Sequence, residues 1–183
     1  MKIHFLIIIF LVSYSICFSQ SGSLDIGFGN NGFVRTDIDS SMDNANAMVI
    51  QPDKKIILVG DSYMDDGMNT EFTIVRYNSN GSIDSSFGVF GKVIIPISES
   101  HDTPFDVKLQ EDGKILIAGL STRDQPLSNF TLVRLLEDGQ LDKSFGDNGI
   151  IIEDFCNSAK FRSICLQSDG KILAAGEGSF DKL

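Results

Sequence analysis

The chain has 183 residues, a formal net charge of −10 and 42% hydrophobic residues. This length is sufficient for one domain with a sizeable core. The acidity excludes nucleic acid and an anionic membrane surface as expected partners, because phosphate contacts need Lys and Arg.

The first 19 residues have the pattern of a cleaved secretory signal peptide. Lys2 is followed by an apolar core from Phe5 to Val12, and the small residues Cys17 and Ser19 stand three and one before Gln20. The whole apolar run covers 14 residues, whereas a membrane-spanning helix needs roughly 20. We therefore expect residues 1–19 to be removed and 20–183 to be exported, that is secreted, periplasmic or at the cell surface, with no stable membrane insertion.

Three phrases recur along the mature chain at intervals of about 59 and 58 residues. The phrase "GSLDIGFG" from Gly22 returns as "GSIDSSFG" from Gly81 and "GQLDKSFG" from Gly139. The phrases "QEDGKILIAG" and "FTLVRLLEDG" also have counterparts in the same phase. Several phrases in one phase predict a repeat protein, with repeats at about 22–80, 81–138 and 139–183, the last truncated.

Each repeat contains up to four short strand patterns and no helix of ordinary length. The first follows a glycine in "GFVRTDI", "GKVIIPI" and "GIIIEDF". The second, "NAMVIQ" and its counterparts, places alternate apolar residues such as Met48 and Ile50 on one face. The third, "KILIAG", is a continuous apolar run typical of a strand covered on both faces. The fourth is "FTIVRY" or "FTLVRL".

Turn residues separate the second and third strands of each repeat. Asp-Gly at Gly113 and Gly170 predicts a type I′ hairpin, because that turn needs positive φ. Lys54 stands in the glycine position of the first repeat, so a different turn type is an open alternative there.

Four strands in about 60 residues predict a blade of a β-propeller, in which stacked sheets bury each other's faces. An open β-solenoid or sandwich is the alternative. The fold class is therefore all-β, with blades of four antiparallel strands.

The phrases "GSIDSSFGVFGKV", "QEDGKILIAG" and "FTLVRLLEDG" resemble the delta-60 repeat family of bacterial exported proteins. The resemblance covers about residues 22–178, with Gly27 and Lys54 as departures from the pattern. It implies a β-propeller and an exported or surface location. It carries no catalytic motif.

The strand phase indicates that the propeller is incomplete. If "NAMVIQ" is the innermost strand, blades run from about 45 to 97 and from 103 to 155, and a half blade covers 161–176. The segment "GFVRTDI" is then a loose outer strand, of the kind that completes the last blade of a closed propeller. About 2.5 blades fall short of the four usually needed for closure, so we expect a fragment of a longer protein, or chains that associate edge to edge.

The "LDxSFG" phrase is expected to form the connector from one blade to the next. Its phenylalanines are predicted to pin the connector to the core, and its repeated aspartate to cap a turn, pair with an arginine or bind calcium. Since Arg76 and Arg134 each precede such an aspartate by eight residues on a strand face that a neighbouring blade covers, we predict two ion pairs. The predicted structural residues of the connector are Asp25, Asp84, Asp142, Phe28, Phe87 and Phe145.

Residues typical of catalysis or metal binding are sparse. His101 lies between serines and Asp102 in a loop, which is not the spatial arrangement that a triad needs. No cofactor, metal or catalytic residue is predicted, and whether Cys156 and Cys165 form a disulfide is left open.

Two function classes follow from the sequence. The favoured one is a binding or scaffold module for a protein or glycan, using the loops at 61–70 and 121–128, which differ between repeats. The alternative is a hydrolase- or lyase-like enzyme with a central channel, for which the inner strands offer Asp106, Lys108 and Ser163.

Overall fold

The computed structural model describes residues 22–38, 42–63, 69–124, 127–154, 156 and 158–179. The predicted signal peptide lies outside these residues, as do parts of both predicted binding loops. Within the described chain the regular structure consists of ten β-strands.

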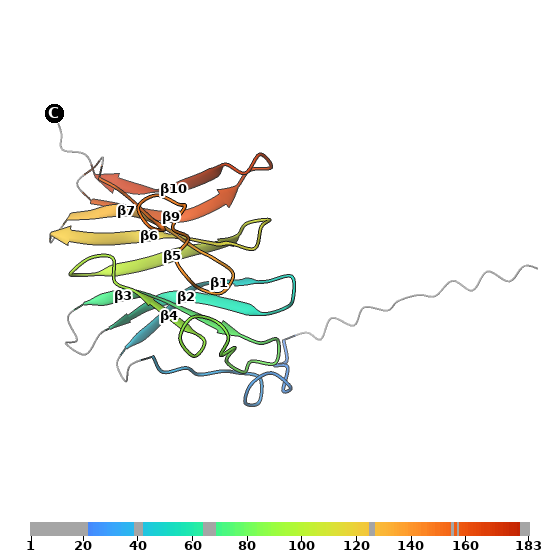
Figure 1. Cartoon of the computed structure of the whole chain (residues 1–183). Coiled ribbons are helices and arrows are strands. Elements are labelled where there is room, and N and C mark those ends of the chain that lie inside the picture. Colours follow the sequence, from blue (N-terminus) through green and yellow to red (C-terminus); the bar gives the residue numbers. More distant parts are fainter. Residues whose placement is uncertain are drawn as a thin grey trace, which may run out of the picture.

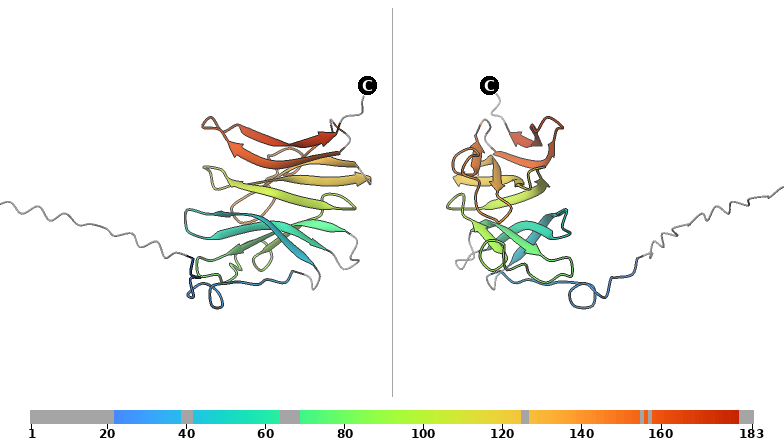
Figure 2. Two further views of the ribbon diagram at one scale, coloured as in Figure 1. Left: turned by 180° about the vertical axis from the view of Figure 1, so that it is seen from behind. Right: turned by 45° about the vertical axis from the view of Figure 1, so that its right-hand side comes forward.

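The strands form two complete blades and half of a third, stacked as shown in Figures 1 and 2. Blade 1 contains β1 (Asp43–Ile50), β2 (Ile56–Tyr63), β3 (Thr70–Tyr77) and β4 (Lys92–Ile95). Blade 2 contains β5 (Asp102–Leu109), β6 (Ile115–Asp124), β7 (Leu127–Leu135) and β8 (Ile150–Glu153), and the half blade contains β9 (Ser158–Leu166) and β10 (Ile172–Ser179).

Within each blade the strands pair antiparallel in sequence order. A single parallel bridge between Ser128 of β7 and Ser158 of β9 connects blade 2 to the half blade. The chain is therefore a partial, open β-propeller, as the repeat length and strand pattern predicted.

The core lies between the blades rather than within one sheet. Ile57 and Val59 of β2 pack with Ile115 and Ile117 of β6 between the two complete blades. The alternate β6 residue Leu116 faces the other way and packs in a second cluster against the half blade. The continuous apolar run of β6 thus serves two interfaces at once, because blade 2 lies between blade 1 and the half blade.

The same position in the repeat is buried or exposed according to its neighbours. Val107 of β5 is 1% exposed, whereas Met48, its counterpart on β1, is 58% exposed. Blade 1 has a blade on one face only, so Met48 and Ile50 lie uncovered in the described chain.

The predicted loose outer strand, residues 32–38, pairs in no ladder in the described chain. The segment nevertheless contacts blade 1 in the same way as the chain after β4 contacts blade 2. The backbone N–H of Ile38 donates to Asp43 Oδ2 at 3.0 Å, as that of Ile97 donates to Asp102 Oδ2 at 2.8 Å. The Tyr77 hydroxyl donates to Thr36 Oγ1 at 2.7 Å. Residues 32–38 therefore make the contacts expected of the outer strand of a preceding blade, although the described chain contains no third strand with which they pair.

The three hairpins at one end of the blades, on the right in Figure 1, share one turn type. Lys54, Gly113 and Gly170 have φ of 69°, 82° and 82°, and the aspartate before each has no positive φ. The prediction of a type I′ turn is therefore wrong. The loop has three residues with a left-handed last position, since Gly113 N donates to Gln110 O and Gln110 N donates to Lys114 O. Lys54 adopts this turn despite its Cβ.

No helix in the described residues is long and apolar enough to cross a membrane.

Candidate functional site

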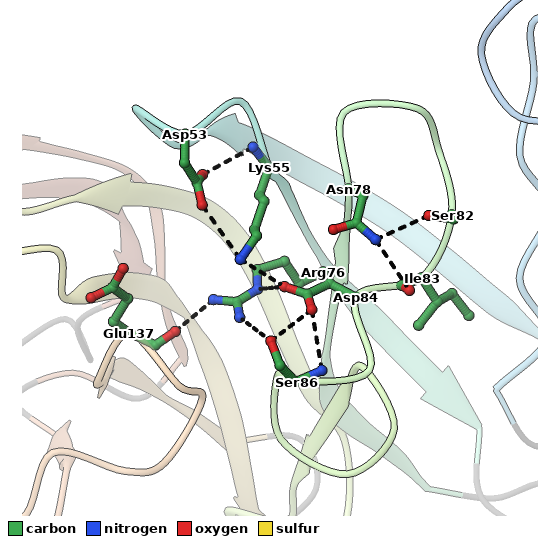
Figure 3. Close-up of polar contacts among 9 residues, drawn as sticks. All are labelled: Asp53, Lys55, Arg76, Asn78, Ser82, Ile83, Asp84, Ser86 and Glu137. Carbon is green, nitrogen blue, oxygen red and sulfur yellow. Dashed lines mark hydrogen bonds and ion pairs between the residues drawn. The ribbon is translucent and has the colours of Figure 1, made fainter.

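The predicted pair between Arg76 and Asp84 is present and forms the centre of a polar cluster (Figure 3). Arg76 Nε donates to Asp84 Oδ2 at 2.8 Å, and one terminal nitrogen donates to the backbone oxygen of Glu137 in the next repeat at 2.6 Å. Its guanidinium carbon lies 4.6 Å from the ring centroid of Phe87, and its side chain is 5% exposed. Lys55 Nζ approaches the same carboxylate oxygen to 3.2 Å. We call Lys55, Arg76, Asp84, Ser86 and Phe87 the blade 1 latch.

The aspartate of the latch also caps the connector turn. Both the backbone N–H and the hydroxyl of Ser86 donate to Asp84 Oδ1. Burial favours the neutral carboxyl, but these hydrogen bonds, together with Lys55 and Arg76, lower the pKa of Asp84 well below its usual range. Turn capping and arginine pairing, which the sequence left as alternatives, are both carried out by one side chain.

The second repeat has the same cluster, the blade 2 latch. Arg134 Nε donates to Asp142 Oδ2 at 2.8 Å, the guanidinium stands 4.2 Å from the centroid of Phe145, and Lys114 Nζ is 3.4 Å from Asp142. The hydrogen bond from the Ser144 hydroxyl lowers the pKa of Asp142 to about 2, against the effect of burial and with help from the Ser144 N–H, Arg134 and Lys114. The Arg134 side chain is 16% exposed.

The first connector shows what is left without the arginine. Asp25 accepts the backbone N–H of Gly27 at 2.9 Å, so its turn-capping contact persists. Phe28 is half-buried, whereas Phe87 is fully buried. The two latches are therefore fastenings between repeats rather than a ligand site.

A β-bulge recurs on the first strand of each blade, which the sequence analysis missed. The ladder skips Asn46 in β1, Phe105 in β5 and Arg162 in β9. A glycine lies opposite each bulge; a side chain at Gly119 would collide with the Thr103 carbonyl oxygen. Because a bulge re-aims the extra side chain, these three residues project differently from their neighbours.

The bulge residues link adjacent first strands. Asn46 Nδ2 donates to Pro104 O of β5 at 2.9 Å, and it also donates to Asp61 Oδ1. The guanidinium of Arg162 lies 4.9 Å from the ring centroid of Phe105 and bonds Glu177. The first strands β1, β5 and β9 therefore carry a row of bulge side chains, Asn46, Phe105 and Arg162, in which an amide, an aromatic ring and a cation follow one another.

The three channel residues predicted from sequence meet in this row. Lys108 Nζ donates to Asp106 Oδ1 at 2.6 Å, and Ser163 Oγ and Ile164 N donate to Asp106 Oδ2 at 3.1 and 2.9 Å. Burial opposes ionisation, but these hydrogen bonds lower the pKa of Asp106. Ser163 donates a hydrogen bond to a carboxylate that also accepts from Lys108 and from the backbone N–H groups of Val107 and Ile164. These contacts suit a bridge between strands better than an activated nucleophile.

The opposite end of the blades from the hairpins contains a hollow of about 570 Å³. It lies between the loop that joins blade 1 to blade 2, with Ile97 to Glu99, and the ends of β6, β7 and β8. Its blade 2 lining residues are Ser121, Asn129, Ile152 and Asp154. The described residues of the two predicted binding loops belong mostly to strands rather than loops: residues 61–63 to β2, Thr70 to β3, 121–124 to β6 and 127–128 to β7. These strand ends lie at the same end of the blades as the hollow, which Ser121 lines.

His101 stands near this end without forming a triad. Its Nδ1 lies 3.5 Å from Thr70 Oγ1, and its ring meets that of Tyr63 edge to face. Ser98 Oγ donates to Asp102 rather than to the histidine. Burial raises the pKa of Asp102, although bonds from Ser98 and Ile97 act in the opposite direction.

Cys156 and Cys165 are both free thiols in the structure, half-buried and exposed respectively. Within the described residues, no group of three or more His, Cys, Asp or Glu side chains is arranged to hold a metal ion.

Comparison with known proteins supports the repeat at the level of family. Residues 51–87 and 110–145 match the model of a family described as "Domain of unknown function (DUF5122) beta-propeller". Each matched segment runs from the hairpin turn to the connector phenylalanine, and so contains one entire latch. A search of curated proteins finds no match. A propeller-like repeat family is thereby supported, and the finer resemblance to delta-60 repeats stays a prediction.

Proposed function

We propose that the chain is an exported β-propeller module that binds a protein or glycan partner through the loop end of its blades. The observation that carries the proposal is the hollow at that end, which is lined by the interblade loop at 97–99 and by Ser121, Asn129, Ile152 and Asp154 of blade 2. Loops held by a rigid sheet framework are where binding residues concentrate.

The chemistry of the hollow favours a polar ligand. Glu99 is exposed, while Ser121 and Asn129 are buried and contribute a hydroxyl and an amide group to the lining. Ile97 and Ile152 provide apolar walls. A few polar groups between apolar walls can orient a sugar ring or a peptide side chain.

The binding proposal is tested by replacing one carboxylate at each end of the blades. The full chain is applied to a glycan array and to immobilised candidate surface proteins as wild type, Glu99→Arg and Glu111→Arg. Glu111 is an exposed residue of the hairpin end and serves as the matched control. We expect Glu99→Arg to weaken any specific binding by about tenfold or more, with Glu111→Arg unchanged. Binding that depends on Glu111 and not on Glu99 contradicts the proposal.

Export is proposed from the N-terminal pattern and is tested separately. Mass spectrometry of protein recovered outside the producing cell should show a chain that begins at Gln20. An intact Met1, or a lipid on Cys17, contradicts this part of the proposal.

A further inference from the structure

Phe90 adopts a left-handed backbone conformation that is unfavourable for phenylalanine. It occupies the connector turn between Phe87 and β4 with φ of 52°, and the equivalent residues Asn31 and Asn148 have φ of 54° and 52°. Asparagine tolerates this left-handed region, whereas a bulky aromatic residue there is strained. The turn itself therefore gives no reason for phenylalanine at this position.

The side chain of Phe90 does not contribute to the core either. Phe90 is 80% exposed and its neighbour Val89 is 71% exposed. The other two connectors have Asn-Asn and Asp-Asn at these positions. One connector thus presents two apolar side chains to solvent where its counterparts present polar ones.

The turn that carries them is held firmly. Val89 N donates to Lys92 O at 2.8 Å, Gly91 N donates to Phe87 O at 2.8 Å, and Gly88 N donates at 2.9 Å to the backbone oxygen of Asp138, the last residue of the same repeat. Val89 and Phe90 therefore form a fixed apolar knob, with little conformational entropy left to lose on binding.

An apolar hollow of about 640 Å³ adjoins the knob. Its further lining includes Val93 and Ile94 of β4 and Gly139 and Gln140 of the next connector. A protrusion and a hollow side by side on one surface are what a two-fold, self-complementary contact requires.

The adjoining strand edge is also unprotected. β4 pairs with β3 only, so its outer edge is open in the described chain. The equivalent strand β8 is preceded by Asp147 and Asn148, polar residues of the kind that keep sheet edges apart. Two β4 edges related by a two-fold axis would run antiparallel, with each knob over the other copy's hollow.

Charge favours a second copy over a basic partner at this surface. Among the described residues that line the hollow there is no carboxylate, and the one ionic side chain, Lys92, donates to the backbone oxygen of Asp37 at 2.8 Å. The chain as a whole carries a net charge of −10, so two copies repel each other less at this apolar patch than at the acidic remainder of the surface. We propose that the surface formed by Val89, Phe90, Val93 and Ile94 is the contact through which two copies of this chain associate.

The test is sedimentation velocity of the full chain from about 1 to 300 µM, at low and high salt. Phe90→Asn restores the residue of the sister turns and so keeps the fold. Ile26→Asn, at a connector residue that is 79% exposed, is the matched control. We expect the wild type to dimerise, more tightly at high salt because like net charges are screened. Phe90→Asn should weaken the dimer by about tenfold or more with an unchanged or higher melting temperature, and Ile26→Asn should leave it unchanged.

Three outcomes overturn the proposal. One is a wild-type chain that stays monomeric throughout. Another is association that persists in Phe90→Asn and weakens in Ile50→Ser, which would place the contact on the open face of blade 1. The third is a Phe90→Asn variant that melts lower than the wild type, which would give the aromatic ring a structural role.

Discussion

Replacing Arg76 with methionine tests whether the blade 1 latch stabilises the fold. Methionine keeps most of the stem volume and removes the charge. The carboxylate of Asp84 would then keep the bonds from Ser86 and the ammonium of Lys55, while the backbone oxygen of Glu137 would lose its donor.

Removing one partner of a buried ion pair costs about 3–5 kcal/mol of unfolding free energy. The remaining Lys55 contact, at 3.2 Å, places Arg76→Met at the lower end. We therefore expect a loss of about 3 kcal/mol, which for a domain of this size lowers the melting temperature by about 6–12 °C. Arg134→Met should cost less, because Arg134 is more exposed and, among the described residues, its hydrogen bonds go to Asp142 and Ser144, with no counterpart of the Arg76 bond to the Glu137 backbone oxygen.

The assay is thermal and urea unfolding of the full chain, monitored by circular dichroism. Arg35→Met, at an exposed arginine, is the control and should change stability by less than about 0.5 kcal/mol. The double variant Arg76→Met with Asp84→Asn should recover part of the loss, since it no longer buries a poorly compensated charge. A loss below about 1 kcal/mol for Arg76→Met alone would refute a buried pair and indicate a solvated one.

Three further predictions concern other parts of the repeat. The pKa of Asp142 falls from 3.8 to about 2 on folding, so its contribution to stability is present above pH 4 and lost as pH falls towards 2; Asp142→Asn should flatten an acid titration of stability over that interval. Lys54→Gly should stabilise the chain by about 0.5–1 kcal/mol by relieving positive φ, and Gly113→Lys should destabilise it; equal melting temperatures for all three proteins would contradict a shared turn. Phe87→Ala should cost about 3–5 kcal/mol and Phe28→Ala clearly less, because only Phe87 is fully buried; urea midpoints that shift equally would count against this reading.

The arginine–aspartate pairs could be predicted from the sequence because they depend on local geometry. Period-two alternation fixes the strand face of Arg76, and eight residues are enough for the chain to turn back onto it. The strand order could also be predicted, because the same strand patterns follow one another in the same order in successive repeats.

Features that depend on neighbours or on backbone irregularity could not be predicted. A glycine ends the third strand pattern of each repeat, at Gly60, Gly119 and Gly176, and such a glycine is a sign of a bulge. It does not identify the skipped residue of the facing strand, so Asn46, Phe105 and Arg162 were not recognised. The alternation pattern places Met48 and Val107 on equivalent faces, but only the stacking of blades shows that one of them is covered. The Asp-Gly pairs correctly indicated hairpins. The number of residues in each hairpin loop depended on the register of the two strands, which the sequence does not show.

The contact that joins consecutive latches has a consequence for how such arrays change over evolutionary time. Arg76 reaches the main-chain oxygen of residue 137, and every amino acid supplies that oxygen. The position holds glutamate in one repeat and serine, Ser79, in the preceding one. A fastening that makes no demand on its partner's side chain leaves each repeat interchangeable with any other, so that duplication, loss or reordering of repeats needs no matching substitution at the new junction.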